Sequence, residues 1–80
     1  MDYGELGRQV AQLRKEKAWS QQQLADYAAI SRPTLSAFEN GRPGEIGLRK
    51  LLVILDLLGL SIKLVEKRSR PTLEDLLDEQ

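Results

Sequence analysis

Two helix-start signals stand close together in this sequence and constrain its fold more than any other feature. In each signal a bulky apolar residue precedes a serine, at Trp19-Ser20 and at Ile30-Ser31. A serine caps the free amides of a helix start, and the apolar residue before it packs against another in the next turn. Leu24 and Leu35 occupy those partner positions. The sequence therefore predicts two short helices joined by a turn of about three residues, which is a helix-turn-helix.

Residues inside the two short helices support the same boundaries. Gln23 is spaced so that its side chain returns to the Ser20 amide, which predicts a reciprocal capping box and a helix from Gln21. Pro33 fits the first turn of the next helix, because its missing N–H would have no partner there. That helix is expected to end at Asn40-Gly41, since these residue types readily adopt the left-handed conformation.

One further helix is expected on each side of this pair. Leu6, Val10 and Leu13 follow the spacing of one helix face, which predicts a helix over about residues 5–17. Leucines recur at helical intervals over residues 48–58, until a glycine ends the pattern. The expected domain is therefore all-α, with four helices in residues 1–59.

After the fourth helix the hydrophobic pattern changes to a period of two. Leu60, Ile62 and Leu64 alternate with other residues, which predicts one β-strand within a unit of residues 60–68. A lone strand cannot satisfy its own backbone, and the sequence offers no second strand. We therefore expect the same strand of a second copy to pair with it, in a two-fold homodimer. The alternative is an extended segment packed on the fourth helix.

Composition excludes most site chemistries. The chain has neither cysteine nor histidine, which removes disulfides, thiolate nucleophiles, imidazole bases and ordinary zinc or haem ligand sets. Carboxylate pairs occur at Glu74-Asp75 and Asp78-Glu79, but no pocket is expected there to exclude water. We therefore expect no enzyme, no cofactor and no metal. Because no apolar run approaches the roughly 20 residues of a membrane span, and no secretion signal opens the chain, we expect a cytoplasmic protein without a membrane partner.

Charge is unevenly distributed, although the 12 basic and 12 acidic residues cancel. All 12 basic residues precede Pro71, whereas four acidic residues follow it. This asymmetry suggests a polyanion for the body and a different partner for residues 69–80. The sequence of this tail also predicts one amphipathic helical turn; the alternative is a terminus that stays solvated. The apolar residues of that turn are Leu73, Leu76 and Leu77.

The second short helix is suited to lie in the DNA major groove. Arg32 offers a guanidinium fork to guanine O6 and N7, and Pro33 or Ala37 fits against a thymine methyl. Other polar residues, at the helix starts and just after the second short helix, are placed to contact phosphates. The base-contact candidates are Arg32, Pro33, Ser36 and Ala37, and the phosphate-contact candidates are Gln21, Ser31, Thr34, Asn40 and Arg42.

Several of these residues also have structural interpretations. Ser31 is a helix cap first, and an arginine on a helix surface is commonly just solvated. Glu39 would repel phosphate, so we predict that it pairs with Arg14 of the first helix. Trp19 and Phe38 are expected in the core.

The two motifs together resemble the Cro/C1-type (XRE) helix-turn-helix family over about residues 5–60. They read Ser20-Gln21-x-x-Leu24-Ala25 and Ile30-Ser31-x-x-Thr34-Leu35-Ser36-x-Phe38-Glu39-Asn40-Gly41. The resemblance implies a lambda-repressor-like fold and double-stranded DNA as partner. It implies base contacts for Arg32, Pro33 and Ala37, and phosphate contacts for Gln21, Thr34 and Asn40. One departure is Ala29, where the family usually has glycine; alanine adopts a positive φ only at a cost, which predicts a strained turn.

Within that family, a strand in place of the usual fifth helix resembles HipB-type antitoxins. Those proteins dimerise partly through this strand, repress their own operon and bind HipA-like kinase toxins. The resemblance implies a homodimer on a palindromic operator, with a HipA-like kinase as second partner. The tail is similar to the terminal segments of several antitoxin classes, which suggests that its leucines contact the toxin.

Two other functions remain open at this stage. A stand-alone dimeric repressor, of phage or restriction-control type, would keep residues 1–66 and leave the tail without a partner. A helix-turn-helix used only for protein contacts would have no DNA affinity, which Arg32, Thr34 and Asn40 on one face argue against.

Overall fold

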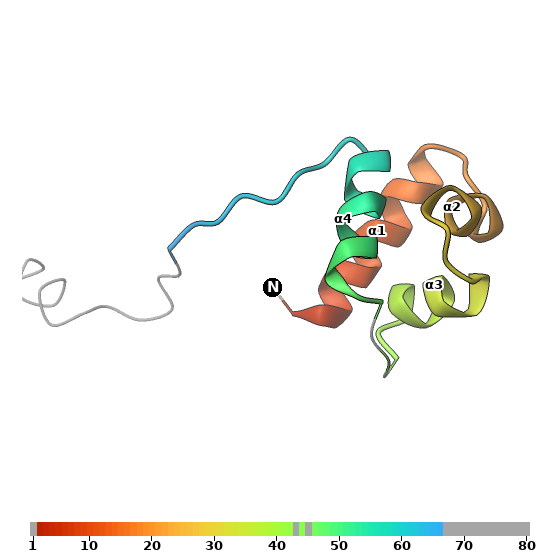
Figure 1. The fold of residues 1–80 in the computed structure, drawn as a ribbon, viewed down its shortest axis with the longest axis horizontal. Coiled ribbons are helices and arrows are strands. Elements are labelled where there is room, and N and C mark those ends of the chain that lie inside the picture. Colours follow the sequence, from red (N-terminus) through yellow and green to blue (C-terminus); the bar gives the residue numbers. More distant parts are fainter. Residues whose placement is uncertain (1, 43, 45, 67–80) are drawn as a thin grey trace, which may run out of the picture.

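Four helices form the protein in the computed structural model, which describes residues 2–42, 44 and 46–66 (Figure 1). No strand occurs in these ranges. The predicted all-α, four-helix architecture is confirmed. The helices are α1 (Tyr3–Glu16), α2 (Gln21–Ala28), α3 (Arg32–Glu39) and α4 (Leu48–Leu57).

Side-chain caps fix where the first three helices begin. Ser20 Oγ accepts from the Gln23 amide at 3.0 Å, and Gln23 Oε1 accepts from the Ser20 amide at 2.8 Å, so the predicted capping box is confirmed. Ser31 Oγ likewise accepts from the Thr34 amide at 3.2 Å. At α1 the cap is Asp2, whose Oδ1 accepts from the Glu5 amide at 2.8 Å. This cap starts α1 two residues earlier than the apolar spacing indicated.

The turn between α2 and α3 depends on a left-handed alanine. Ala29 has φ 57° and ψ 44°, and the chain closes behind it through a hydrogen bond from the Ile30 amide to the Ala25 carbonyl at 3.0 Å. A non-glycine residue in this region has Cβ close to its own backbone, which costs about 1 kcal/mol. The positive φ expected for Ala29, which stands where the family usually has glycine, is confirmed.

The core lies where α2 contacts both α3 and α4, and where α1 packs against α3. Phe38 is fully buried, as predicted, and its ring meets Tyr3 edge-on at 5.3 Å between centroids. Trp19 is only half-buried: it packs against the core and meets Tyr27 edge-on. The buried apolar residues are Val10, Leu24, Ala25, Ala28, Leu35, Phe38, Ile54, Leu55 and Leu58.

Close approach of α1 to α3 depends on a glycine. Gly7 is buried, and a Cβ built on it would lie 2.0 Å from the Phe38 carbonyl oxygen. The Phe38 carbonyl is part of the backbone, so it cannot move away from such a Cβ as easily as the end of a flexible side chain could. Gly7 therefore sets the distance between α1 and the end of α3.

Beyond α4 the chain leaves the helical body (Figure 1). Gly59 has φ 78°, and the Leu60 amide donates to the Leu55 carbonyl at 2.8 Å, which ends the helix. Residues 61–66 then run without regular structure, and Leu64 is 92% exposed. Each of these six residues is exposed. A strand needs a second strand to pair with, and one chain alone cannot test this, so strand pairing between two copies stays a prediction. The tail residues 69–80 lie outside the described part of the chain.

Candidate nucleic-acid interface

The outward side of α3 carries the four base-contact candidates. Arg32 and Pro33 are exposed in the first turn, and Ser36 and Ala37 are half-buried one turn later. Leu35 and Phe38 point into the core, which fixes the rotation of α3 about its axis. Polar and small side chains are thus displayed on a helix whose other side is anchored. The contacts of these residues with DNA stay predictions.

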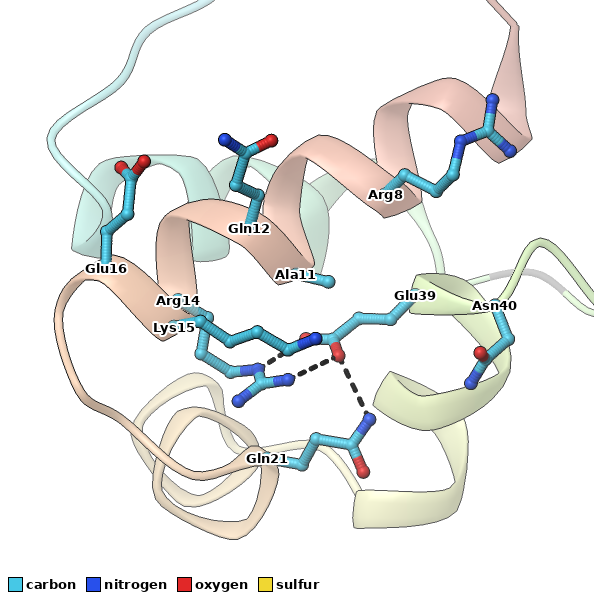
Figure 2. Close-up of a pocket in the computed structure, with 9 residues that line it drawn as sticks. All are labelled: Arg8, Ala11, Gln12, Arg14, Lys15, Glu16, Gln21, Glu39 and Asn40. Atoms are coloured by element: carbon cyan, nitrogen blue, oxygen red, sulfur yellow. Dashed lines mark hydrogen bonds and ion pairs between the residues drawn. The ribbon is translucent and has the colours of Figure 1, made fainter.

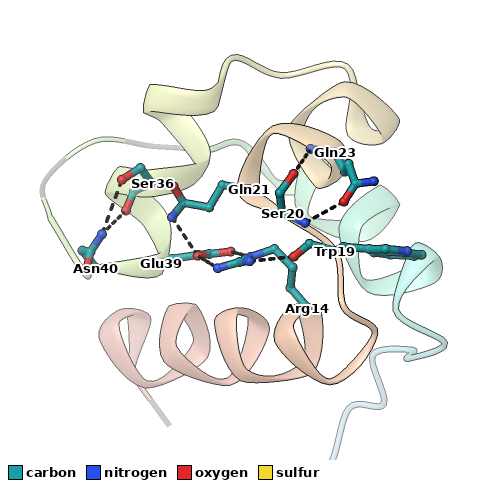
Figure 3. Close-up of polar contacts among 8 residues, drawn as sticks. All are labelled: Arg14, Trp19, Ser20, Gln21, Gln23, Ser36, Glu39 and Asn40. Atoms are coloured by element: carbon teal, nitrogen blue, oxygen red, sulfur yellow. Dashed lines mark hydrogen bonds and ion pairs between the residues drawn. The ribbon is translucent and has the colours of Figure 1, made fainter.

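A buried ion pair attaches α3 to α1. Arg14 Nε donates to Glu39 Oε2 at 2.8 Å, and Nη2 donates to Oε1 at 2.9 Å (Figure 3). The two side chains are 8% and 3% exposed. The third nitrogen, Nη1, donates to the Trp19 carbonyl at 2.8 Å. The predicted Arg14–Glu39 pair is confirmed, and the same guanidinium also holds the turn before α2.

Gln21 extends this network to the protein surface. Its Nε2 donates to Glu39 Oε1 at 3.0 Å (Figure 3). A primary amide has two N–H donors on one nitrogen, so the second remains for a ligand. Glu39 therefore orients the amide of Gln21, a predicted phosphate contact. Sequence spacing carried no signal for this bond, because it joins the start of α2 to the end of α3.

Ser36 accepts hydrogen bonds from two neighbours. Arg42 Nη2 donates to Ser36 Oγ at 3.2 Å, and Asn40 Nδ2 lies 3.4 Å from the same oxygen. Asn40 Nδ2 also donates to the Ser36 carbonyl at 2.8 Å (Figure 3). With its oxygen engaged, the hydroxyl proton of Ser36 remains available to an acceptor on a base edge. The structure thus brings together one base-contact candidate and two phosphate-contact candidates.

Ser31 and Thr34 form a polar pair at the start of α3. Their hydroxyl oxygens lie 2.8 Å apart, and Ser31 Oγ also caps the Thr34 amide. Ser31 is exposed and Thr34 is half-buried. Capping of α3 is enough to explain a serine at position 31, so any phosphate contact of Ser31 is secondary.

An apolar hollow of about 270 Å³ lies beside Pro33 and Ala37. Tyr3 closes one side, where its hydroxyl donates to the Gly44 carbonyl at 3.0 Å. This bond ties the loop after α3 to the first turn of α1. The hollow is lined by Tyr3, Pro33, Thr34, Ala37, Phe38, Gly44 and Ile46.

Comparison with known proteins identifies the family. A family model described as a helix-turn-helix domain matches residues 5–67. A curated relative, the competence pilus inhibition repressor of Acinetobacter baylyi (strain ATCC 33305 / BD413 / ADP1), is 48% identical over 40 residues. That alignment covers 50% of this chain and only 36% of the repressor.

Two solved structures share the fold. A chain of SinR, the master regulator for biofilm formation, in complex with DNA, matches with a TM-score of 0.64 and 28% identity, over 70% of this chain and 89% of that chain. A chain of the HipA–HipB–O2–O3 complex matches with a TM-score of 0.69 and 30% identity, over 82% of this chain and 92% of its own length. The chain therefore belongs to the XRE-like helix-turn-helix family of DNA-binding domains.

Proposed function

We propose that this chain is a homodimeric, sequence-specific DNA-binding repressor that acts as the antitoxin and autoregulator of an operon encoding a HipA-like kinase. The observation that carries DNA recognition is the outward face of α3, with Arg32 exposed in its first turn and the buried Arg14–Glu39 pair holding the helix from behind. A rigid helix with a free guanidinium fork suits a guanine edge in the major groove.

Changing Arg32 to alanine tests base recognition. The variant should lose about 1–3 kcal/mol at a matched duplex and discriminate less at one base pair. Fluorescence anisotropy with the matched duplex and a scrambled duplex of equal length measures both effects. Equal losses on the two duplexes would make Arg32 a phosphate contact and refute base readout by this side chain.

The homodimer is supported by apolar surface that a monomer leaves in water. Leu48, Leu52 and Val53 are exposed on α4, and Leu48 is 66% exposed. The chain continues from this helix into exposed Leu60, Ile62 and Leu64. Pairing of this segment between two copies would cover the apolar side chains and satisfy the backbone. A dimer would present two α3 helices about 34 Å apart, to half-sites one helical turn apart on a palindrome.

Lys63→Pro tests the strand. Proline removes a backbone donor and adds a ring, which disrupts a strand ladder. We expect weaker dimerisation by sedimentation at micromolar concentration. A sedimentation mass equal to that of the parent dimer would refute strand pairing.

The antitoxin role is supported by the similarity to the HipA–HipB–O2–O3 complex, which covers 82% of this chain. Co-expression of the untagged chain with each neighbouring open reading frame, tagged one at a time, tests it. A stoichiometric kinase-like partner would support the role. Loss of that partner on deletion of residues 70–80 would assign its contact to the tail, including Leu73, Leu76 and Leu77.

A stand-alone repressor is the second candidate. The similarity to SinR and to the competence pilus inhibition repressor favours it, since one is named a master regulator and the other a repressor. It predicts tight binding to the chain's own promoter and no co-purifying partner. Both candidates imply a non-enzymatic regulator in the cytoplasm. No helix in the described ranges is long and apolar enough to cross a membrane.

A further inference from the structure

A hollow lies between α1 and the helix-turn-helix (Figure 2). Its volume is about 660 Å³. Gln21 and Asn40, both predicted phosphate contacts, line the side formed by α2 and α3. Five residues of α1 besides Arg14 form the other side, and none of them was a candidate from the sequence. We call this the α1–α3 hollow; it is lined by Arg8, Ala11, Gln12, Arg14, Lys15, Glu16, Gln21, Glu39 and Asn40.

Positive charge in the α1–α3 hollow is available to a ligand, whereas its buried acid is not. The Glu39 carboxylate accepts two hydrogen bonds from Arg14 and one from Gln21. Its charge is therefore compensated within the protein. Arg8 and Lys15 are exposed, and the described residues place no carboxylate within ion-pair distance of either.

Spacing along α1 places these two cations together. Arg8 and Lys15 are seven positions apart, which is about two helical turns and about 10 Å along one face. Ala11 lies between them, and its small side chain leaves the middle of that face open (Figure 2). Glu16 also lines the hollow, beside Lys15 at the end of α1. The face thus carries one cation near each end, with Glu16 beside Lys15, and amide donors lie on the opposite side.

We propose that the α1–α3 hollow binds the phosphodiester backbone of DNA next to the half-site read by α3, with Lys15 and Arg8 as its cationic contacts. Gln21 supplies its free amide proton from across the hollow, and Asn40 lies on the same side. This inference rests on the proposed DNA-binding function and extends the DNA footprint from α3 to α1. Because phosphates carry no sequence information, these contacts contribute affinity and orientation, and not base preference.

Two lysines near the same end of α1 provide a matched test. Lys15 lines the α1–α3 hollow, whereas Lys17 does not and instead lies over the Trp19 ring at 5.5 Å. Lys15→Gln and Lys17→Gln remove the same charge close together in the sequence. Binding to a labelled 24-bp duplex of arbitrary fixed sequence is measured by anisotropy between about 50 and 200 mM salt.

We expect Lys15→Gln to bind this duplex roughly threefold to tenfold more weakly at low salt. The slope of log K against log salt should become less steep by about 0.9 for each phosphate that the variant no longer neutralises, and Lys17→Gln should keep the parent slope. Arg8→Gln should repeat the Lys15 result. Equal thermal melting of the variants, followed by circular dichroism, verifies that the substitutions leave the fold unchanged.

The outcomes separate this inference from the proposed function. If Lys15→Gln and Lys17→Gln have equal slopes, whether changed or unchanged, the hollow is not a phosphate site, although DNA binding by α3 stands. If the parent chain itself fails to bind any duplex at low salt, the proposed function fails first. A reduced slope in Lys15→Gln and Arg8→Gln alone establishes the site.

Discussion

The helix-turn-helix side of this molecule differs from its α4 side in how many of its side chains find a partner within one chain. Around α3, the polar groups are joined in a network that runs from Arg14 through Glu39 to Gln21. Within the described residues, no buried side-chain nitrogen or oxygen lacks a hydrogen-bond partner. On the other side, α4 and the segment after it expose large apolar side chains to water. The first region is complete in one chain, and the second has the character of an interface.

This contrast explains why the two regions should respond differently to substitution. Changes in the closed network remove interactions within the chain, so they should lower the free energy of unfolding. Changes on exposed α4 should leave the fold intact and alter association. The following substitutions test that division.

Glu39→Ala should have the largest effect. It leaves the buried Arg14 guanidinium without its carboxylate and releases Gln21. Breaking a buried pair in this way costs about 3–5 kcal/mol, which approaches the whole stability of a domain of this size. Urea unfolding followed by circular dichroism measures the loss. A cost below about 1 kcal/mol would show that the network does not hold α3.

Gly7→Ala should follow, because the new Cβ would meet the Phe38 carbonyl oxygen at 2.0 Å. We expect a loss of about 1–3 kcal/mol, since backbone must shift to make room. Gly4→Ala is the matched control: it lies in the same helix, and its Cβ would meet only side-chain atoms at 3.5 Å. That control should be neutral or stabilising by up to about 1 kcal/mol. Equal melting temperatures for the two variants would contradict the close approach of α1 to α3.

Leu52→Lys tests the exposed apolar surface of α4. Leu52 is exposed, so the unfolding free energy of the monomer should change by less than about 0.5 kcal/mol. Dimerisation should weaken at least about tenfold, because the charge would be buried between copies. Sedimentation equilibrium measures the dimer dissociation constant. A variant that unfolds more easily but dimerises as before would show that Leu52 stabilises the fold and does not belong to a dimer interface.

Ala29→Gly should have the smallest effect, and a favourable one. Glycine tolerates the observed φ of 57° without a Cβ conflict, although it adds backbone entropy to the unfolded chain. The net gain should be about 0.5 kcal/mol, seen as a higher urea midpoint. A lower midpoint would mean that the turn is not strained in solution.

Local features were predictable from the sequence because their partners lie a few residues apart. The Ser20–Gln23 capping box and the Ser31 cap have fixed spacings in the chain, and both are confirmed. Arg14–Glu39 was predictable despite its distance in sequence, because an acid beside the predicted DNA-binding face would repel phosphate unless a basic partner compensated its charge. Asp2 shows the limit of apolar spacing, because it starts α1 before the first apolar repeat.

Contacts set by packing were not predictable. The Gly7–Phe38 approach depends on the distance between two helix axes, and the Gln21–Glu39 bond depends on how α2 and α3 are rotated. The α1–α3 hollow likewise forms only when α1 is docked. The pairing of the segment after α4 needs a second chain, and the tail leucines lie beyond the described residues, so both stay predictions.

Selection of duplexes from a random-sequence DNA library by the full chain tests the central claim most directly. If two α3 helices read DNA as a symmetric dimer, the enriched duplexes will share an inverted repeat whose half-site centres lie about one helical turn apart. Arg32→Ala will relax the preference at one position of each half-site. Enrichment of no common sequence, or of a single half-site without a repeat, would contradict the account.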